Sequence, residues 1–454
     1  MSAEGGFGEM LDRYANSGAA RFHMPGHKGV GAGFFADIFK SDITELSFSD
    51  NLASPEDTVA DIQRRWAETL DAENTHLLVN GSTTGILAMI LALGTNKRVL
   101  LGRDCHMSAI NALALAHDTA VPVFPDANGV LSAEKIDRAL TAEPCDAVFI
   151  TYPNYYGVCL DIEEVSETAR KHGALLLVDN AHGAHFAFSP RFPKTPSRYA
   201  DAWVTSVHKT LPSLTQTAVL CRGFGSRIDD GALKRCVNMV QSSSPSYILM
   251  RSLEYALECA KGLDFEAHIG RVERVRERIS ALHGYSIGER SEVKDASRLT
   301  IDTRGRGICG FDVARFLESK NVYVEMADRD KIVCITSPLD KDEWYDRLIN
   351  ALDDAPQREP MPQIVYEPFG ERTTPLDIGE AMFAESEDVC VESAVGRRVS
   401  RAFGIYPPGV ALLMPSETVR ETDVREVQRQ MRLGAKFFGM SSNMLSCIKE
   451  LKDI

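Results

Sequence analysis

Thr205-Ser206-Val207-His208-Lys209-Thr210 lies at the end of an apolar run, residues 201–205, and decides the fold class. An apolar run bounded by small polar residues predicts a buried strand followed by a loop. A second such run, residues 174–178, ends at Asp179 and continues through Asn180-Ala181-His182-Gly183. Because ligands of open α/β sheets lie outside the carboxyl ends of the strands, we expect both loops to contribute to one ligand site.

One loop contains a lysine and the other begins at an aspartate, and such a pair can bind one cofactor. A lysine can hold pyridoxal 5'-phosphate (PLP) as a Schiff base, while an aspartate pairs with the pyridinium nitrogen of the same cofactor. Taken singly, Lys209 is explained as a surface lysine and Asp179 as a helix cap. Their delivery by two strands to the same edge of a sheet favours PLP binding instead.

Length and composition exclude several classes of protein. A chain of 454 residues is too long for one hydrophobic core and predicts two or three domains. A content of 44% hydrophobic and 25% charged residues is typical of a soluble enzyme, and the net charge of −14 argues against a nucleic-acid partner. No apolar stretch reaches the roughly 20 residues of a membrane span, and residues 1–6 do not resemble a signal peptide. We therefore expect a cytoplasmic protein without a membrane partner.

The ten cysteines include no Cys-x-x-Cys pair, so the sequence has neither a zinc cluster nor a redox motif. We expect them to be small, buried hydrophobic residues in a reducing compartment, and we predict no metal site.

The chain is predicted to have four parts, namely an N-terminal arm (1–55), a PLP-binding large domain (56–284), a small α/β lobe (285–358) and a C-terminal domain (359–454). In the large domain, apolar runs alternate with helix-length or loop segments at 76–79, 98–101, 121–124, 147–150, 175–178, 202–205 and 218–221. This alternation predicts an α/β fold with a mostly parallel sheet covered by helices. Ser54 and Pro55 predict the start of a helix that runs to Leu70.

The small lobe is expected to contain strands at 298–303, 322–325 and 331–336 and helices at 310–319 and 341–352. A proline-rich linker follows at 353–362.

The first predicted strand leads into Asn80-Gly81-Ser82-Thr83-Thr84-Gly85, which precedes an apolar helix at 86–93. Glycine and hydroxyl residues at a helix N-terminus can cradle a phosphate, because the backbone N–H groups and the helix dipole attract an anion. Serine and threonine are also common helix caps without any ligand. The shared sheet edge with Asp179 and Lys209 favours phosphate binding.

Three further segments contain candidate functional residues. His106 follows the second strand and either begins a helix or stacks on the cofactor ring, and we favour stacking. The aromatic loop 152–157 follows another strand end and stays unassigned. The segment 23–28 surrounds a Pro-Gly turn, and its composition alone favours a surface turn.

These residues are specific enough to identify a resemblance. The chain resembles the bacterial ornithine/lysine/arginine decarboxylases, which are fold-type-I PLP enzymes of the aspartate aminotransferase superfamily, and within them the short forms without the N-terminal wing domain. The resemblance spans nearly the whole chain and rests on Phe22-His-Met-Pro-Gly-His-Lys28, Asp42-Ile-Thr-Glu-Leu46, Asn80-Gly-Ser-Thr83, Thr151-Tyr-Pro-Asn-Tyr-Tyr-Gly157, Val178-Asp-Asn-Ala-His-Gly-Ala-His185, Ser206-Val-His-Lys-Thr-Leu-Pro212, Gln241-Ser-Ser-Ser-Pro-Ser-Tyr247 and Tyr406-Pro-Pro-Gly409. So many matches in order make coincidence negligible.

The resemblance implies a role for each candidate residue. Lys209 holds PLP as a Schiff base, Asp179 keeps the ring nitrogen protonated, and His106 and Ala181 lie on opposite faces of the ring. The implied phosphate ligands are Ser82, Thr83, Thr84, Ser206 and His208, and His182 is a further cofactor-binding residue. The sites of this family lie between two subunits of a homodimer or a higher oligomer. Ser243 is therefore expected to reach the partner's phosphate, and segment 23–28 is expected at the subunit interface rather than in a surface turn.

The chain departs from the family pattern at three positions. Asn180 stands where many short members have glutamate, and His182 replaces the tryptophan of the long enzymes, as in the short forms. Ser416 replaces the glycine of a Pro-Gly-Glu turn, which affects the position of Glu417 and any role it has near the distal cation of the substrate.

The resemblance implies PLP-dependent decarboxylation of a basic amino acid, with arginine favoured, then lysine or ornithine, to CO2 and the corresponding polyamine or diamine. An aminotransferase or a Cys-type lyase is the alternative, because one fold hosts many chemistries. An aminotransferase would hold the substrate carboxylate with an arginine, for which Arg298, Arg304 and Arg306 are candidates. A non-catalytic regulator is a third possibility, and the intact pair of Asp179 and Lys209 argues against it.

Overall fold

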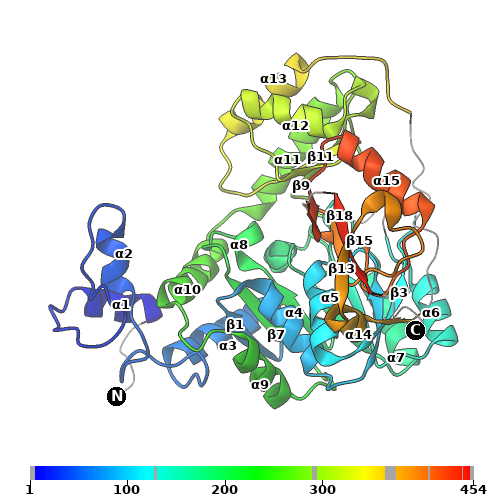
Figure 1. Cartoon of the computed structure of the whole chain (residues 1–454). Helices are drawn as coiled ribbons and strands as arrows, with labels where there is room; N and C mark the ends of the chain where they lie inside the picture. The colour runs from blue at the N-terminus through cyan, green and yellow to red at the C-terminus, as the bar shows by residue number, and fades with distance from the viewer. Residues whose placement is uncertain are drawn as a thin grey trace. The chain divides into compact units, whose positions relative to one another are not determined.

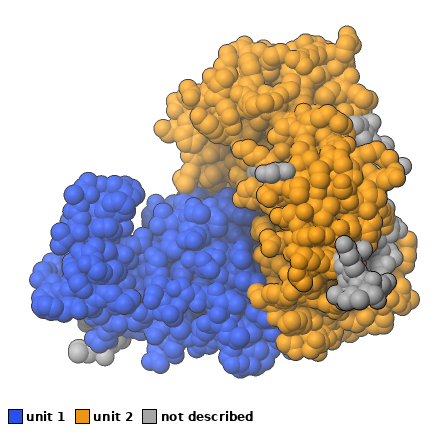
Figure 2. All heavy atoms as spheres, in the orientation of Figure 1, with its two compact units in different colours: residues 1–92, 177–190, 194–263 blue, residues 93–176, 191–193, 264–454 orange. Residues whose placement is uncertain are grey.

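The computed structural model describes residues 6–126, 130–288, 294–362, 375–406, 409–441 and 443–449. Residues 1–5 of the arm and Pro407 and Pro408 of the Tyr406-Pro-Pro-Gly409 motif lie outside the described residues. The chain divides into two compact units (Figure 2). The first unit comprises residues 1–92, 177–190 and 194–263, and the second comprises 93–176, 191–193 and 264–454. The division into four parts stays a prediction.

In the first unit, the sheet order is β1 (Asn74–Leu78), β7 (Ala218–Arg222), β6 (Ala202–Thr205) and β5 (Leu175–Asp179). Of strand β5, the carboxyl end belongs to this unit. Strand β7 is antiparallel to both β1 and β6, while β5 and β6 are parallel. Strands β1, β5 and β6 therefore run in the same direction. Their carboxyl ends, and the loops that follow them, lie at one edge of the sheet.

Helix α4 (Gly81–Leu91) follows β1 and packs against β6. The packing is so close that a Cβ atom at Gly85 would lie 2.5 Å from Cγ2 of Val204. The other helices of this unit include α1 (Phe7–Ala15), α2 (Phe35–Ser41), α9 (Asp230–Val240) and α10 (Tyr247–Lys261), which Figure 1 labels. The absence of a side chain at Gly85 thus lets the helix N-terminus approach the strand that leads to Lys209.

Helix α3 (Thr58–Leu70) ends where the sequence predicts but starts later, at Thr58 rather than at Pro55. The carboxylate of Asp50 accepts hydrogen bonds from the backbone N–H groups of Glu56, Asp57 and Val59, at distances between 2.9 and 3.0 Å. Asp50 therefore takes the capping role that the sequence assigned to Ser54, because a loop folds back and brings its carboxylate to the helix start.

In the second unit, the sheet order is β4 (Ala147–Thr151), β2 (Arg98–Gly102), β3 (Thr119–Val123) and β12 (Leu376–Asp377). Strand β2 is parallel to β3 and β4, and the short β12 is antiparallel to β3. Helix α5 (Met107–Ala116) connects β2 to β3, α6 (Ala133–Ala142) connects β3 to β4, and α7 (Ile162–Lys171) follows β4. Each predicted strand of the large domain is present within a few residues of its expected bounds, and the mostly parallel α/β fold is confirmed.

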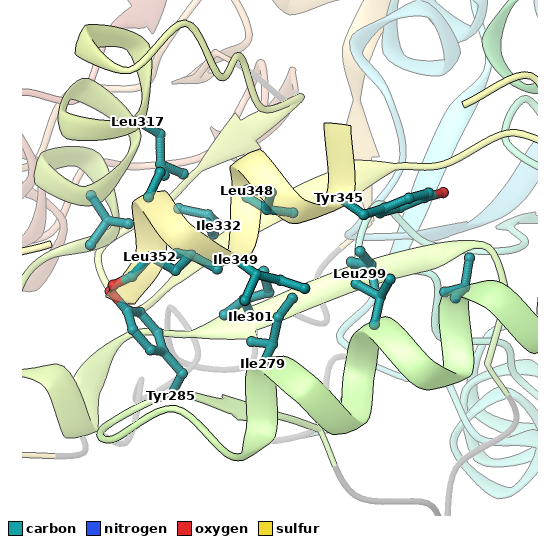
Figure 3. Close-up of a cluster of buried hydrophobic side chains, with 14 of the residues drawn as sticks. Ile279, Tyr285, Leu299, Ile301, Leu317, Ile332, Tyr345, Leu348, Ile349 and Leu352 are labelled. Carbon is teal, nitrogen blue, oxygen red and sulfur yellow. Dashed lines mark hydrogen bonds between the residues drawn. The ribbon is translucent and has the colours of Figure 1, made fainter. Parts of the chain in front are cut away.

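The second unit also contains an antiparallel sheet in the order β10 (Met326–Ala327), β11 (Lys331–Ile335), β9 (Arg298–Asp302) and β8 (Ser286–Ile287). Helices α11 (Phe265–Ser280), α12 (Gly310–Ser319) and α13 (Asp342–Asp354) accompany it. Side chains from these elements form the hydrophobic core drawn in Figure 3. The prediction of a strand at 322–325 is wrong. Val322 and Val324 pack against this core and Tyr323 is exposed, but strand pairing starts only at Met326.

The described residues of the C-terminal part of the second unit form two three-stranded sheets. One has the order β13 (Ser386–Cys390), β18 (Met444–Ile448) and β17 (Met440–Ser441), and the other the order β15 (Val410–Leu413), β14 (Phe403–Ile405) and β16 (Phe437–Phe438). Helices α14 (Ile378–Phe383) and α15 (Glu421–Arg432) belong to this part. Among the described residues, no helix combines the length and the apolar character needed to cross a lipid bilayer.

Candidate functional site

Lys209 lies in the one-turn helix α8 (Val207–Thr210). A single residue, Ser206, separates this helix from the end of β6 at Thr205. Its Nζ atom is 3.1 Å from Nε2 of His182, in the segment that follows β5. Because β5 and β6 are parallel neighbours, their carboxyl ends lie side by side. Within the first unit, the structure thus brings together the two loops that the sequence predicts to converge.

Asp179 is the last residue of β5 and is 3% exposed. Its Oδ1 atom accepts a hydrogen bond of 3.0 Å from the backbone N–H of Ala181, which is buried as well. Asn180 is also buried, and its side chain occupies the space beside Gly183, where a Cβ atom would lie 2.1 Å from Nδ2. A buried carboxylate held in this way suits the role of partner to a pyridinium nitrogen, because an opposite charge raises the pKa of the cation.

Ser206 provides a test of whether the site fits a cofactor. Its hydroxyl oxygen is buried and has no hydrogen-bond partner among the described residues. Such a group is unusual, because nearly all buried polar atoms are hydrogen bonded. Two residues further on, His208 donates a hydrogen bond from Nδ1 to the carbonyl of Thr217 at 2.8 Å, and burial lowers the pKa of His208. The Ser206 hydroxyl is thus a donor that a cofactor phosphate would satisfy.

The start of helix α4 provides a second test. Asn80 is its N-cap residue, but the Asn80 side chain makes no hydrogen bond to the first turn. Ser82 is half-buried and Thr83 exposed, whereas Thr84 is buried and its hydroxyl donates to the carbonyl of Asn80 at 3.4 Å. Ser82 and Thr83 are therefore better placed than Thr84 to contact an anion. A helix N-terminus without a side-chain cap, together with the Ser206 hydroxyl, fits the phosphate of PLP.

Ser243 is exposed and lies in the loop between α9 and α10. The neighbouring Gln241 anchors this loop to β1, because its side chain accepts a hydrogen bond from Val79 N–H at 2.9 Å and donates one to the carbonyl of Leu77 at 3.4 Å. The loop therefore starts at the same sheet edge as the loops above. The contact of Ser243 with a partner's phosphate stays a prediction.

His106 belongs to the second unit and is the N-cap residue of α5. Its Nδ1 atom accepts a hydrogen bond from Ser108 N–H at 3.2 Å and is 2.8 Å from the Ser108 hydroxyl oxygen. The next residue, Met107, donates a hydrogen bond from its backbone N–H to the carbonyl of Gly409 in the C-terminal part, at 3.1 Å. His106 is thus a helix-start histidine, as in the first of the two sequence interpretations, and this does not conflict with a role in stacking.

A buried ion pair joins Arg103 to Glu417, with 3.3 Å between Nη2 and Oε2 and both side chains almost fully buried. The sequence did not reveal this pair, because 314 residues separate its members and neither lies in a local motif that predicts the other. Ser416 has a φ angle of +76°, which explains the glycine usual in this turn of the family. Glu417 nevertheless keeps a defined position, in which Oε2 also accepts a hydrogen bond from Met414 N–H at 2.8 Å.

The three arginines that an aminotransferase could use have structural partners. Arg304 contacts both carboxylate oxygens of Asp302 through Nε. Arg306 donates to the backbone carbonyls of His283, Asp353 and Ala355. Arg298 is buried beside Asp295 and donates to the carbonyl of Tyr155 at 3.3 Å, and burial lowers its pKa. These contacts engage the three guanidinium groups within the second unit and give no support to the aminotransferase alternative.

Comparison with known proteins gives one family and several relatives. Residues 6–285 match the model of the major domain of Orn/Lys/Arg decarboxylases. The arginine decarboxylase of Halalkalibacterium halodurans is 28% identical, over 97% of this chain and 96% of the relative. The arginine decarboxylase of Bacillus subtilis is also 28% identical, over 98% of this chain and 97% of the relative.

Solved structures with a similar fold include the lysine decarboxylase of Francisella novicida, with a TM-score of 0.82, 15% identity and coverage of 97% of this chain and 80% of that one. The constitutive lysine decarboxylase of Escherichia coli gives a TM-score of 0.75 at 18% identity, covering 98% and 82% of the two chains. An alanine–glyoxylate aminotransferase of Nostoc sp. gives 0.54 at 19% identity, over 65% of this chain and 85% of the other.

Proposed function

Because the chain belongs to the family of Orn/Lys/Arg decarboxylases, we propose that it is a PLP-dependent decarboxylase of a basic amino acid. Arginine is the favoured substrate, as both full-length relatives above are arginine decarboxylases, and lysine and ornithine follow. The products are CO2 and the corresponding polyamine or diamine. The observation that carries the proposal is the contact between Lys209 and His182, next to the buried Asp179.

When bound, PLP supplies an electron sink for the carbanion that remains at Cα after loss of CO2. The residues of the chain bind and orient it. Lys209 binds the cofactor through Nζ, and Asp179 holds the proton on the ring nitrogen. Ser206, with the first turn of α4, receives the phosphate, and His208 is a further phosphate ligand. His106 and Ala181 would hold the cofactor ring by stacking on its faces.

His182 is in contact with the amine of Lys209. Its Nε2 atom lies within hydrogen-bond distance of the Lys209 amine, and the imidazole is almost fully buried. A neutral imidazole can take up a proton from an ammonium group and return it later. We assign to Nε2 of His182 the task of taking up the proton that Nζ of Lys209 must lose before its amine can react, and of returning it to Nζ afterwards.

A homodimer with shared active sites is part of the proposal. The N-terminal arm exposes apolar side chains, among them Phe22 at 96%, Phe34 at 79% and Val30 at 76% exposure. Such a concentration of exposed apolar residues is typical of a protein interface. The described residues contain no disulfide among the ten cysteines, which suits the reducing cytoplasm where we propose the enzyme works.

The test is a product assay on the purified chain with added PLP and arginine, lysine or ornithine. The proposal requires CO2 and the amine from at least one of them, whereas a keto acid without CO2 would support an aminotransferase. Borohydride reduction followed by peptide mapping must place the pyridoxyl group on Lys209. Lys209→Ala should abolish turnover and still bind PLP without a covalent bond, while Lys171→Ala, which removes an exposed lysine paired with Asp137, is the matched control. A label on another lysine would refute the assignment.

A further inference from the structure

Gly409 lies directly against the ring of His106. A Cβ atom at Gly409 would be 3.2 Å from both Cδ2 and Nε2 of His106, so a side chain here would press on the ring and shift it by a few tenths of an ångström. The φ angle of Gly409 is +86°, a left-handed conformation that residues with a side chain rarely adopt. Glycine at this position therefore serves two needs at once, the backbone conformation and the space for the imidazole.

The backbone on both sides fixes this contact. Met107 N–H donates a hydrogen bond to the Gly409 carbonyl at 3.1 Å, and His106 forms an isolated antiparallel bridge with Val410. The opposite edge of the ring is held by Ser108, whose N–H and hydroxyl both contact Nδ1. The imidazole thus lies between Ser108 at its Nδ1 edge and Gly409 at its Cδ2–Nε2 edge, and both neighbours restrict its orientation.

Arg103 holds the same two segments together a few residues away. Its Nη1 and Nη2 atoms donate to the carbonyls of Ala411 and Leu412, each at 3.0 Å, in addition to the ion pair with Glu417. The guanidinium is buried, so these contacts act where water does not compete for them. Residues 409–417 are therefore fastened to the loop of residues 103–107 at several points.

We propose that Gly409 is a positioning residue for His106, and that segment 409–417 acts on the reaction by setting the plane of this imidazole. The inference rests on the proposed function, in which His106 stacks on the PLP ring. Stacking depends on ring orientation, and a shift of the imidazole by a few tenths of an ångström or a rotation away from the ring plane weakens it. Although the C-terminal part of the chain lies outside the matched major domain, it would thereby contribute to cofactor alignment.

The test compares Gly409→Ala with Gly434→Ala. Gly434 has the same φ angle of +86°, but a Cβ atom there would meet nothing within 4 Å. Gly434→Ala therefore introduces the same backbone strain as Gly409→Ala but no steric clash. We expect Gly409→Ala to bind PLP about two- to tenfold more weakly than Gly434→Ala, the range that corresponds to loss of an aromatic stacking contact. PLP affinity is measured by titration of the apoprotein, and circular dichroism of the bound cofactor reports its alignment. Equal affinities and equal cofactor spectra would overturn the inference.

The His106→Ala background shows whether Gly409 acts through the imidazole. If it does, adding Gly409→Ala to His106→Ala has no further effect on PLP affinity, because the two changes remove the same contact. An equal loss in both backgrounds would overturn the inference. If the wild-type chain binds no PLP at all, the proposed function itself fails, which is a distinguishable result.

A readout without cofactor completes the test. In the apoprotein, Gly409→Ala should move the imidazole resonance of His106, identified by its absence in His106→Ala, whereas Gly434→Ala should leave it in place. If Gly409→Ala does not fold, Ser108→Ala, which removes only the hydroxyl at the opposite edge of the ring, should produce the same shift and a weaker affinity for PLP. An unchanged resonance would overturn the inference.

Discussion

The Nζ atom of Lys209 lies 3.1 Å from Nε2 of His182, and the imidazole is 2% exposed. Two basic nitrogens in contact hold one proton more easily than two, because a second proton would place two cations side by side away from bulk water. The pair is therefore suited to pass a single proton between its two members.

His182→Leu should slow the formation of the Schiff base on Lys209 by at least about 100-fold, the lower end of the usual contribution of an acid–base group. His182→Gln should be slow as well, because its amide can accept a hydrogen bond but cannot take up a proton. Stopped-flow absorbance after mixing apoprotein with PLP measures this rate. His172→Gln is the control, since this histidine pairs with Asp137 on the surface of the second unit. Rates for His182→Leu equal to the control would remove His182 from the proton transfer.

Asp179→Asn should lower kcat far more than His106→Ala does. The amide keeps an oxygen acceptor for Ala181 N–H but loses the charge that keeps the ring nitrogen protonated, whereas loss of His106 affects mainly cofactor affinity and alignment. We expect kcat of Asp179→Asn to fall by at least about 1000-fold. Each factor of ten corresponds to a loss of 1.36 kcal/mol of transition-state stabilisation. The measurement is kcat at saturating PLP. Wild-type activity in Asp179→Asn would refute the role of the carboxylate.

The sequence predicts the convergence of Asp179 and Lys209 from local patterns alone. Apolar runs predict the two buried strands, and the loops that follow parallel strands lie at the same edge of a sheet. It does not predict the contact of Gly409 with His106 or of Glu417 with Arg103, since no periodicity or spacing links segments so far apart. The sequence predicts the start of α3 too early, because the carboxylate of Asp50 reaches the helix from a neighbouring loop.

The error at residues 322–325 has a different cause. Alternation of apolar and polar residues shows which side chains are buried, but it does not show whether the backbone finds a partner strand. The roles of the individual site residues, including Ser243, depend on a cofactor and a partner subunit and stay predictions. Thr84 is the implied phosphate ligand that the local geometry favours least, because its hydroxyl already donates to Asn80.

Asp118 should make the stability of the protein dependent on pH. Burial, above all, raises its pKa to about 6, with the carboxylate of Asp146 adding to the effect and the hydrogen bond from Lys97 N–H opposing it. Because the folded pKa is above the ordinary value of about 3.9, this group contributes stability that is present below about pH 4 and lost as pH rises through 6. The loss amounts to about 2–3 kcal/mol.

Asp118→Asn removes this titration, so its melting temperature relative to wild type should rise between pH 4 and pH 7. Differential scanning calorimetry at several pH values measures the difference. Asp137→Asn is a useful contrast, because hydrogen bonds from Lys171 and His172 lower the pKa of Asp137. A constant difference between wild type and Asp118→Asn over this range would show that the carboxyl does not titrate there.

The buried pair of Arg103 and Glu417 should behave asymmetrically on mutation. Arg103→Met leaves the Glu417 carboxylate buried without its cation, and loss of one partner of a buried ion pair costs about 3–5 kcal/mol. The double variant Arg103→Met/Glu417→Met removes both charges and should recover part of this loss. Thermal unfolding of the two single variants and the double variant measures the coupling. Strictly additive losses would mean that the two side chains contribute independently.

The last prediction concerns the subunit boundary. If Ser243 reaches the phosphate of the partner's site, Ser243→Glu should be impaired, because its carboxylate would repel that phosphate. Mixing it with inactive Lys209→Ala subunits should then restore activity. At equal mixing about half of the dimers are hybrids, and each hybrid has one site with both defects and one with neither, so recovery approaches about a quarter of wild-type activity. No recovery, with hybrid dimers demonstrated by native mass spectrometry, would mean that each site is built from one chain.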